Sequence, residues 1–359
     1  MKRSSVALTY IMSVCRMKVM HVLSSLNVGG AERFVIDLAV EQKQAHGFQT
    51  SVLSMGKKGE PLEVEVNKFK LGLLHGTKIS QLRSYLSQFD IVHVHSSYCL
   101  LRILLASLFL PIKVVYTRHN ERVHTSLKWR FIYSLAKLRL HKMIFVAEKA
   151  RQNYLAIYSG FEKKSCTILN GVLPMITSKT ENKKFRIAHV GRFVPLKAQH
   201  HIIQAIELLP DEIKKTVMLS FYGTGDLLEE NKALANKLIP NVEVNFMGFV
   251  TDRNKIYENT DCLVIASETE GLSLAIIEAL ASGTPTMASN VGGNPELIKH
   301  NINGFLFEYS DVEKLAELLA LLIQDKALYQ RFSQHSIALF EFRFSIERCT
   351  KEYLKEYAH

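Results

Sequence analysis

Short apolar runs alternate with helix-like patterns along almost the whole chain. Strands that alternate with helices form parallel sheets with helices on both faces, because each parallel connection has to cross the sheet. We therefore predict an α/β protein with two doubly wound parallel sheets. The strands are expected at residues 19–23, 50–55, 91–95, 114–117, 143–147 and 167–169, and then at 186–190, 217–222, 242–247, 262–266, 286–289 and 305–307.

The length of 359 residues exceeds what one hydrophobic core usually supports, and the strand pattern restarts near Arg186. The polar stretch Pro174–Lys184 has no apolar period, and we interpret it as a linker. We predict an N-terminal extension over 1–16, a Rossmann-like domain over 17–173, the linker over 174–184, a second Rossmann-like domain over 185–335 and a C-terminal helix over 336–359.

The net charge of +11 is unevenly distributed. Residues 1–180 hold 26 Lys and Arg against 10 Asp and Glu, whereas residues 181–359 hold 19 against 24. The basic half is therefore expected to meet an anion, either a phosphate group or an anionic membrane surface. Nucleic acid is disfavoured as a partner, because the cations are not interleaved with stacking aromatic residues in a recognisable module.

Five cysteines are scattered without a CxxC pair, and no stretch reaches the roughly 18–20 apolar residues of a membrane-spanning helix. These features predict a protein of the reducing cytoplasm. Residues 1–16 faintly resemble a signal peptide but lack a small-residue cleavage site, so we interpret them as an upstream extension. No Asp-x-Asp occurs, which argues against a site built on an Asp-bound divalent metal, and we expect neither a metal nor a cofactor.

The richest chemical motif follows the expected strand at 262–266. Two carboxylates, Glu270 and Glu278, lie eight residues apart around the start of a predicted helix. Eight helical residues span roughly 12 Å, about the distance between the sugar and the ribose of a nucleotide-sugar. The N–H groups at a helix start favour a phosphate between the two acids. The alternative is a surface helix with two solvated glutamates.

Other strand ends carry glycines or cations. Gly29 and Gly30 follow the first strand and allow close approach of a ligand. Arg192 and Lys197 follow the first strand of the second half, where they could hold a diphosphate in place of a metal. Two further glycine pairs follow strands: Gly223-Thr224-Gly225 is interpreted as a tight turn, and Gly292-Gly293 as either a helix start or a ligand contact.

Three histidines and one basic segment complete the candidates. His119 follows a strand, whereas His93 and His95 share one face of a strand. No third metal ligand is evident beside them, so packing roles are favoured. Residues 127–151 form either a helix packed on the sheet or a surface that meets anionic lipid through Trp129, Phe131 and the cations Lys128, Arg130, Lys137, Arg139 and Lys142.

These motifs, in this order, resemble the retaining glycosyltransferases of family four, which share the two-domain GT-B fold. The resemblance covers nearly all of the chain from Met17. It rests on Gly29–Arg33, His119, Asn170-Gly171-Val172, Gly191-Arg192 with Lys197, Met247–Val250, and the stretch from Glu270 through Glu278 to Pro285. One departure is Gly271-Leu272-Ser273, where the family often has Gly-Phe-Gly.

The resemblance implies that the second domain binds a nucleotide-sugar, commonly a UDP-sugar, and that the basic first domain binds the acceptor. The last helix would cross back to the first domain. His119, Glu270, Arg192 and Lys197 are implied as catalytic. The implied donor-binding set is Glu278 at the ribose, Arg192 and Lys197 at the diphosphate, Val250 at the base, Glu270, Gly271, Leu272, Ser273 and Leu274 at the sugar and phosphate, and Gly29 and Gly30 at the phosphates.

The expected activity is a metal-independent transfer of a hexose-type sugar, with retention of configuration, to a saccharide or a polyprenyl-diphosphate-linked saccharide in cell-surface polysaccharide synthesis. The basic half suits an acceptor at the inner face of the cytoplasmic membrane. Two alternatives stay open: a sugar-nucleotide epimerase on the same fold, and a non-catalytic subunit of a polysaccharide assembly complex.

Overall fold

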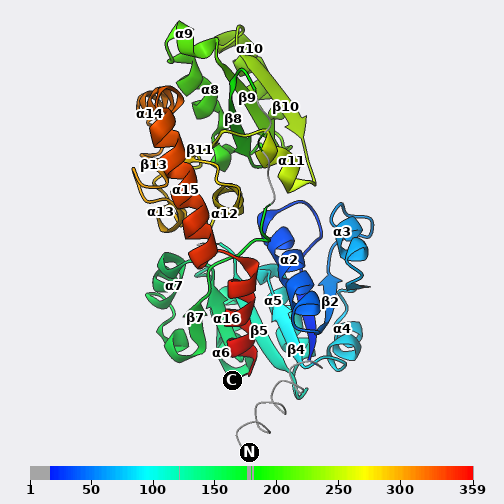
Figure 1. Cartoon of the computed structure of the whole chain (residues 1–359). Helices are drawn as coiled ribbons and strands as arrows, with labels where there is room; N and C mark the ends of the chain where they lie inside the picture. The colour runs from blue at the N-terminus through cyan, green and yellow to red at the C-terminus, as the bar shows by residue number, and fades with distance from the viewer. Residues whose placement is uncertain (1–16, 121, 176–178, 180–181, 359) are drawn as a thin grey trace, which may run out of the picture. The chain divides into compact units, whose positions relative to one another are not determined.

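A computed structural model describes residues 17–120, 122–175, 179 and 182–358 (Figure 1). The predicted N-terminal extension lies outside the described residues, as does part of the predicted linker. The chain divides into two compact units. The first combines the residues up to Gly171 with those from Ile346 onward, and the second runs from Val172 to Ser345.

The first unit is built on a seven-stranded sheet in the order β3-β2-β1-β4-β5-β6-β7, with every pair of neighbours parallel. The order reverses beside β1, which pairs with β2 on one side and β4 on the other. The strands are β1 Lys18–Leu23, β2 Gln49–Ser54, β3 Gly72–His75, β4 Ile91–Val94, β5 Lys113–Arg118, β6 Lys142–Phe145 and β7 Ser165–Thr167.

Helices follow the strands of this sheet in turn, and their apolar sides make the core of the unit. They are α2 Gly30–Gln44, α3 Glu63–Lys68, α4 Ile79–Leu86, α5 Ser97–Ala106, α6 Leu127–Arg139, α7 Glu148–Leu155 and the 3₁₀ helix η1 Ser159–Lys164. The last helix of the chain, α16 (Ile346–Ala358), belongs to this unit and packs against α2.

The second unit repeats the same strand order with one strand fewer: β10-β9-β8-β11-β12-β13, again parallel. Its strands are β8 Phe185–Val190, β9 Val217–Tyr222, β10 Glu243–Gly248, β11 Cys262–Ile265, β12 Thr286–Ser289 and β13 Gly304–Phe307. Its helices are η2 Pro195–Lys197, α8 Gln199–Glu207, α9 Asp211–Lys214, α10 Leu228–Leu238, α11 Arg253–Glu258, α12 Leu274–Ala281, α13 Asn294–Leu297, α14 Val312–Gln324 and α15 Lys326–Arg343.

The predicted α/β class with two doubly wound sheets is confirmed. One strand, β3, was missed in the sequence. The helical pattern predicted over 336–359 is not one element, because α15 ends at Arg343 and α16 begins at Ile346. Since α15 packs along α12, it stays with the second unit, and the observed division lies after Ser345 instead of after residue 335.

The chain enters and leaves the second unit at adjacent points. The backbone N–H of Val172 donates to the carbonyl of Phe344 at 3.0 Å, and Val172 forms a parallel bridge with Ser345. The second unit is therefore one continuous segment whose two ends are hydrogen-bonded to each other. The first unit is discontinuous, because its last helix is added only after that segment.

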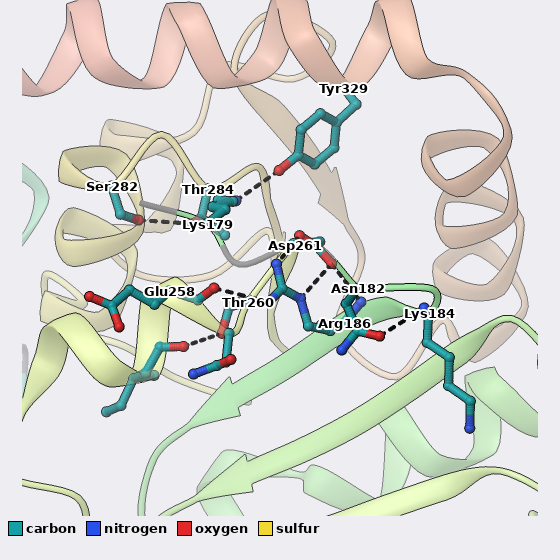
Figure 2. Close-up of polar contacts among 12 residues, drawn as sticks. Lys179, Asn182, Lys184, Arg186, Glu258, Thr260, Asp261, Ser282, Thr284 and Tyr329 are labelled. Carbon is teal, nitrogen blue, oxygen red and sulfur yellow. Dashed lines mark hydrogen bonds and ion pairs between the residues drawn. The ribbon is translucent and has the colours of Figure 1, made fainter. Parts of the chain in front are cut away.

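A buried ion pair joins the beginnings of the two central strands of the second unit (Figure 2). The Arg186 guanidinium donates from Nε and Nη2 to the two carboxylate oxygens of Asp261, both at 2.9 Å, and Nη1 donates to the carbonyl of Glu258 at 3.0 Å. The Arg186 side chain is only 3% exposed. Two parallel bonds between these partners fix the planar group in one orientation.

In the same view, Lys179 Nζ donates to the Tyr329 hydroxyl at 2.7 Å, and burial lowers the pKa of Lys179 to about 8.

We predict that Asp261→Ala lowers the free energy of unfolding by about 3 kcal/mol, because it leaves a buried guanidinium without its carboxylate partner. Urea unfolding followed by circular dichroism measures this change. Glu212→Ala is the matched control, since it removes an exposed carboxylate paired with Lys215 and is expected to change stability by less than about 0.5 kcal/mol. Equal effects of the two substitutions would contradict the role assigned to the Arg186 pair.

Candidate active site

The carboxyl ends of β8 and β11 are the point where the strand order of the second sheet reverses. Loops that leave adjacent strands at such a point diverge to opposite faces of the sheet, and ligands of α/β proteins bind there. The loop after β8 carries Arg192 and Lys197, and the loop after β11 carries Glu270. A backbone hydrogen bond of 2.9 Å from Glu268 N–H to the Leu196 carbonyl ties the two loops together.

The structure brings two predicted residues into direct contact. Lys197 Nζ lies 2.6 Å from Glu270 Oε1, and the Ser267 hydroxyl donates to the same oxygen at 2.7 Å. Glu270 is 9% exposed, whereas the Lys197 side chain is 24% exposed. A lysine ammonium has three N–H donors. Lys197 therefore retains donor capacity for an anionic ligand while Glu270 holds it in position.

The second predicted carboxylate, Glu278, lies in α12 and is also buried. Its Oε1 is 3.4 Å from Arg253 Nη1, and its Oε2 is 3.1 Å from the Tyr257 hydroxyl. Burial and the neighbouring Glu278 raise the pKa of Tyr257 well above its usual value, so this hydroxyl stays protonated. Sequence reasoning missed Arg253 and Tyr257, because only the packing of α11 brings them to this carboxylate.

The segment from Glu270 to Glu278 is not all helical. Helix α12 begins at Leu274, and Ser273 precedes it without a side-chain capping bond. The helical rise therefore applies only from Leu274 to Glu278, and the assumption of eight helical residues behind the 12 Å estimate does not hold. Gly271 and Leu272 form a turn between Glu270 and the helix, and the first turn of α12 leaves backbone N–H groups without intrahelical partners.

Arg192 is exposed, and its loop is held by side chains that sequence reasoning missed. Gln199 Nε2 donates to the Arg192 carbonyl at 2.8 Å and lies 3.3 Å from His189 Nε2. The other nitrogen of His189 contacts the Val264 carbonyl at 2.9 Å, and burial lowers the pKa of His189 to about 4. A neutral imidazole thus links β8, β11 and the loop with Arg192. Val250 follows β10 and is half-buried.

The remaining predicted residues belong to the first unit. Gly29 is the N-cap of α2, Gly30 is its first residue, and a Cβ on Gly29 would lie 2.2 Å from the Glu32 carboxylate. His119 follows β5, with Nε2 3.1 Å from His95 Nδ1. Burial lowers the pKa of His119 to about 4.

The structure supplies the third histidine that was not evident in the sequence. His21 of β1 pairs in register with His93 of β4, and ligand atoms of His21, His93 and His95 lie within 4.8 Å of one another. Each ring nitrogen of these three side chains already has a hydrogen-bond partner, which accounts for their burial without a metal ion. They are discussed further below.

Comparison with protein families identifies both units. The family model for "Glycosyltransferase Family 4" matches residues 28–174, and that for "Glycosyl transferases group 1" matches residues 176–338. This chain is a family 4 glycosyltransferase. The predicted family and the prediction of an enzyme are thereby confirmed.

Full-length relatives agree with this assignment. An uncharacterised glycosyltransferase of Haemophilus influenzae is 27% identical over 91% of this glycosyltransferase and 96% of the relative. The capsular polysaccharide biosynthesis glycosyltransferase CapH of Staphylococcus aureus is 26% identical over 78% of this chain and 83% of the relative. The solved structure of Anabaena HepE in complex with UDP-glucose aligns with a TM-score of 0.82 at 21% identity. The alignment covers 94% of this chain and 99% of HepE. The last comparison shows that the glycosyltransferase has the GT-B fold.

Two glycine loops of the glycosyltransferase pack closely against the backbone beside the site residues. A Cβ on Gly223, whose φ is +143°, would lie 2.0 Å from the Gly191 carbonyl oxygen. A Cβ on Gly293 would lie 2.2 Å from the Gly271 carbonyl oxygen, which already accepts a 2.9 Å bond from the Gly293 N–H. These contacts are between backbones, so only glycine allows the loops to approach this closely.

We predict that Gly293→Ala weakens the structure around Glu270, because the added methyl group has to push the Gly271 backbone away. The expected cost is about 1–3 kcal/mol. Hydrogen exchange read by mass spectrometry should show faster exchange in peptides that cover residues 268–280. Gly160→Ala is the control, since Gly160 is not among the glycines with positive φ and a Cβ there would meet only the flexible end of the Lys137 side chain. Unchanged exchange over 268–280 in Gly293→Ala would refute the supporting role.

Proposed function

We propose that this glycosyltransferase transfers a hexose-type sugar from a UDP-sugar, with retention of configuration and without a bound metal, to a saccharide or lipid-linked saccharide. The observation that carries the proposal is the cluster of Lys197, Glu270 and Ser267 at the point where the strand order of the second sheet reverses. A cation held by a buried carboxylate beside a helix start is suited to an anionic leaving group.

In this proposal, the diphosphate of the donor is bound by Lys197, by Arg192 and by the amides of Gly271, Leu272, Ser273 and Leu274. Arg192 is exposed and its loop is anchored by Gln199, so its guanidinium is available to a ligand. Glu270 contacts the donor sugar, and Glu278 accepts hydrogen bonds from the ribose hydroxyls. The backbone at Val250 meets the base, Gly29 and Gly30 approach the phosphates, and His119 contacts the donor sugar.

The chemistry follows from this set of groups. The acceptor hydroxyl attacks the anomeric carbon from the same side as the leaving diphosphate, which takes up the acceptor proton. The protein positions the reactants and stabilises the negative charge that develops on the diphosphate. Since Lys197, Arg192 and the helix amides supply that stabilisation, and since the chain has no Asp-x-Asp, no metal is required.

Related proteins support the choice of donor and pathway. Anabaena HepE has been solved with UDP and with UDP-glucose. Among the relatives are a capsular polysaccharide biosynthesis glycosyltransferase of Staphylococcus aureus and a lipopolysaccharide core biosynthesis glycosyltransferase of Rhizobium meliloti. A UDP-sugar donor and a cell-surface saccharide acceptor are the substrates consistent with these names.

Lys197→Ala and Glu278→Ala are each predicted to lower donor turnover about 100-fold or more, the usual loss when one preorganised charge-stabilising or orienting group is removed. Thermal-shift screening over nucleotide-sugars first selects the donor. Release of the nucleoside diphosphate is then measured with wild type and variants.

Glu268→Gln is the control for this measurement, because Glu268 is an exposed carboxylate in the same loop and should behave as wild type. Near-normal turnover of the Lys197 and Glu278 variants would refute the site assignment. Conversion of the UDP-sugar into its epimer without any acceptor would refute transfer as the main activity.

A surface of the first unit suits an acceptor carried by an anionic membrane. Leu127 and Leu138 of α6 are each 82% exposed, and Phe131 is 65% exposed. Since 3.6 residues make one turn, these three positions share one face of α6. Cations flank the stripe: Lys128 on one side, and Arg130 and Lys137 on the other. Arg139, beside Leu138, donates to the carbonyls of Ser107, Leu110 and Ile112, in the loop that also exposes Phe109.

This arrangement differs in part from the sequence expectation. Trp129, expected at the membrane interface, stacks on His124 with ring centroids 4.4 Å apart. Ile132, Tyr133 and Ala136 form the buried side of α6. The buried face of α6 therefore belongs to the core of the first unit, and we propose that its exposed face meets anionic lipid. Among the described residues, no helix is long and apolar enough to span a bilayer, and we propose peripheral binding at the inner face of the cytoplasmic membrane.

Phe131→Ser combined with Leu138→Ser is predicted to reduce binding to vesicles of phosphatidylglycerol and phosphatidylcholine about tenfold, since two apolar side chains no longer enter the interface. Cosedimentation measures the bound fraction. Leu321→Ser, at an exposed apolar position of α14 in the second unit, should bind as wild type. Failure of the wild-type protein to bind anionic vesicles would refute the membrane surface without affecting the donor site.

A further inference from the structure

A line of hydrogen-bonded side chains runs through the core of the first unit and ends at His119. Gln42 Oε1 lies 2.9 Å from His21 Nε2, and His21 Nδ1 lies 3.0 Å from His95 Nε2. His95 Nδ1 in turn lies 3.1 Å from His119 Nε2. We call Gln42, His21, His95 and His119 the histidine relay. Gln42, His21 and His95 are buried, and they come from α2, β1 and the end of β4.

A side branch fixes the orientation of the Gln42 amide. The Tyr357 hydroxyl lies 2.6 Å from His93 Nδ1 and 3.4 Å from Gln42 Nε2. Gln42 Nε2 donates to the Tyr357 oxygen, and the single phenol proton is then left for His93 Nδ1. The amide oxygen of Gln42 is therefore the atom that faces His21.

The direction of every bond in the relay follows from that oxygen. Because an amide oxygen only accepts, His21 Nε2 carries a proton and His21 Nδ1 accepts. His95 consequently donates from Nε2 and accepts at Nδ1, and His119 donates from Nε2. Burial lowers the pKa of His21 and of His119 to about 4 each, so both rings are neutral near pH 7. The last ring then has an unprotonated Nδ1.

That Nδ1 atom of His119 is buried and has no hydrogen-bond partner in the described part of the chain. A buried acceptor left unpaired costs free energy, so a ligand that brings a hydroxyl donor to this atom gains by pairing it. The only group that a neutral ring can offer here is a lone pair, which suits a sugar hydroxyl and not a carbonyl or phosphate oxygen.

We propose that Gln42, His21 and His95 are positioning residues that hold His119 in its Nε2–H tautomer, so that Nδ1 accepts a hydrogen bond from a hydroxyl of the donor sugar. The inference rests on the proposed function, which assigns His119 to the donor sugar. It adds which partner donates and which accepts in this contact, and it names the residues that determine this direction. A donor whose contacted hydroxyl is replaced by hydrogen or by a methyl ether should be a poor substrate.

A metal ion bound by His21, His93 and His95 is the competing interpretation of the same cluster. It is disfavoured because His21 and His95 share a proton in a 3.0 Å bond, and both nitrogens of His93 contact hydroxyl groups, Tyr357 at 2.6 Å and Thr117 at 2.7 Å. A metal would have to break these bonds, and no carboxylate is among the ligand atoms grouped there to offset its charge.

The test uses full-length protein labelled with ¹⁵N-histidine, with His119 assigned by comparison with His119→Asn. In the wild type, two-dimensional spectra should show an unprotonated Nδ1 and a protonated Nε2 for His119. Addition of the UDP-sugar selected by thermal shift should move the Nδ1 signal toward the hydrogen-bonded range. A protonated Nδ1 in the free protein would overturn the inference, and this measurement needs no variant of the relay.

His95→Phe breaks the relay, whereas Val94→Ala is the control, because Val94 is buried on the same strand but points to the opposite face of the sheet. His95→Phe should give a mixture of His119 tautomers and lower kcat/KM about tenfold, as expected for one lost hydrogen bond. Val94→Ala should leave the His119 tautomer unchanged. If His95→Phe left it unchanged too, the positioning role would be refuted.

Two further outcomes separate this inference from the proposed function. Sugar transfer with no change of the Nδ1 signal on donor binding would overturn the inference and leave the proposed function intact. Failure of every nucleotide-sugar to bind would overturn both. One equivalent of zinc in the purified protein, measured by mass spectrometry, would overturn the tautomer assignment, because the metal would replace the shared proton of His21 and His95.

Discussion

Parallel strand pairing in two sheets of the same order determines where chemistry can occur in this chain. In each sheet the order reverses beside the first strand of the unit, and the loops that follow adjacent strands then turn to opposite faces. Arg192, Lys197, Glu270 and His119 follow these strand ends, whereas Glu278 lies in the helix that comes next. The apolar interior of the strands contributes rigidity, so the loops carry the polar side chains on a fixed base.

Burial acts on the polar groups of the two units in opposite ways. In the second unit, the buried carboxylates Glu270 and Glu278 form ion pairs with Lys197 and Arg253. In the first unit, burial lowers the pKa of His21, His93 and His95, and the side chains hydrogen-bonded to these three rings are neutral groups. The buried site residues of the second unit therefore form ion pairs, whereas the buried histidines of the first unit form hydrogen bonds between neutral groups.

Sequence reasoning was sufficient to locate strands whose apolar pattern is local and recurs along the chain. It located the strands that end before Lys197 and Glu270, and the parallel topology then implied that these residues meet. It missed β3, because this edge strand has only four residues, begins at Gly72 and is not fully buried at any of them. It missed Arg253, Tyr257 and His21, because each becomes significant only through a partner on another element. Strand register places His21 beside His93 although they lie 72 positions apart in the sequence. No periodicity within either segment predicts this pairing.

The discontinuity of the first unit has a consequence for biosynthesis. Its core includes Tyr353 and Tyr357 of α16, which are fully buried and which contact Thr117 and His93. A ribosome releases the other strands and helices of this unit long before it makes α16. The second unit, a continuous segment, can fold during translation, whereas the polar centre of the first stays incomplete until α16 has been made. Truncation before Tyr353 would thus damage the half of the protein that is synthesised first.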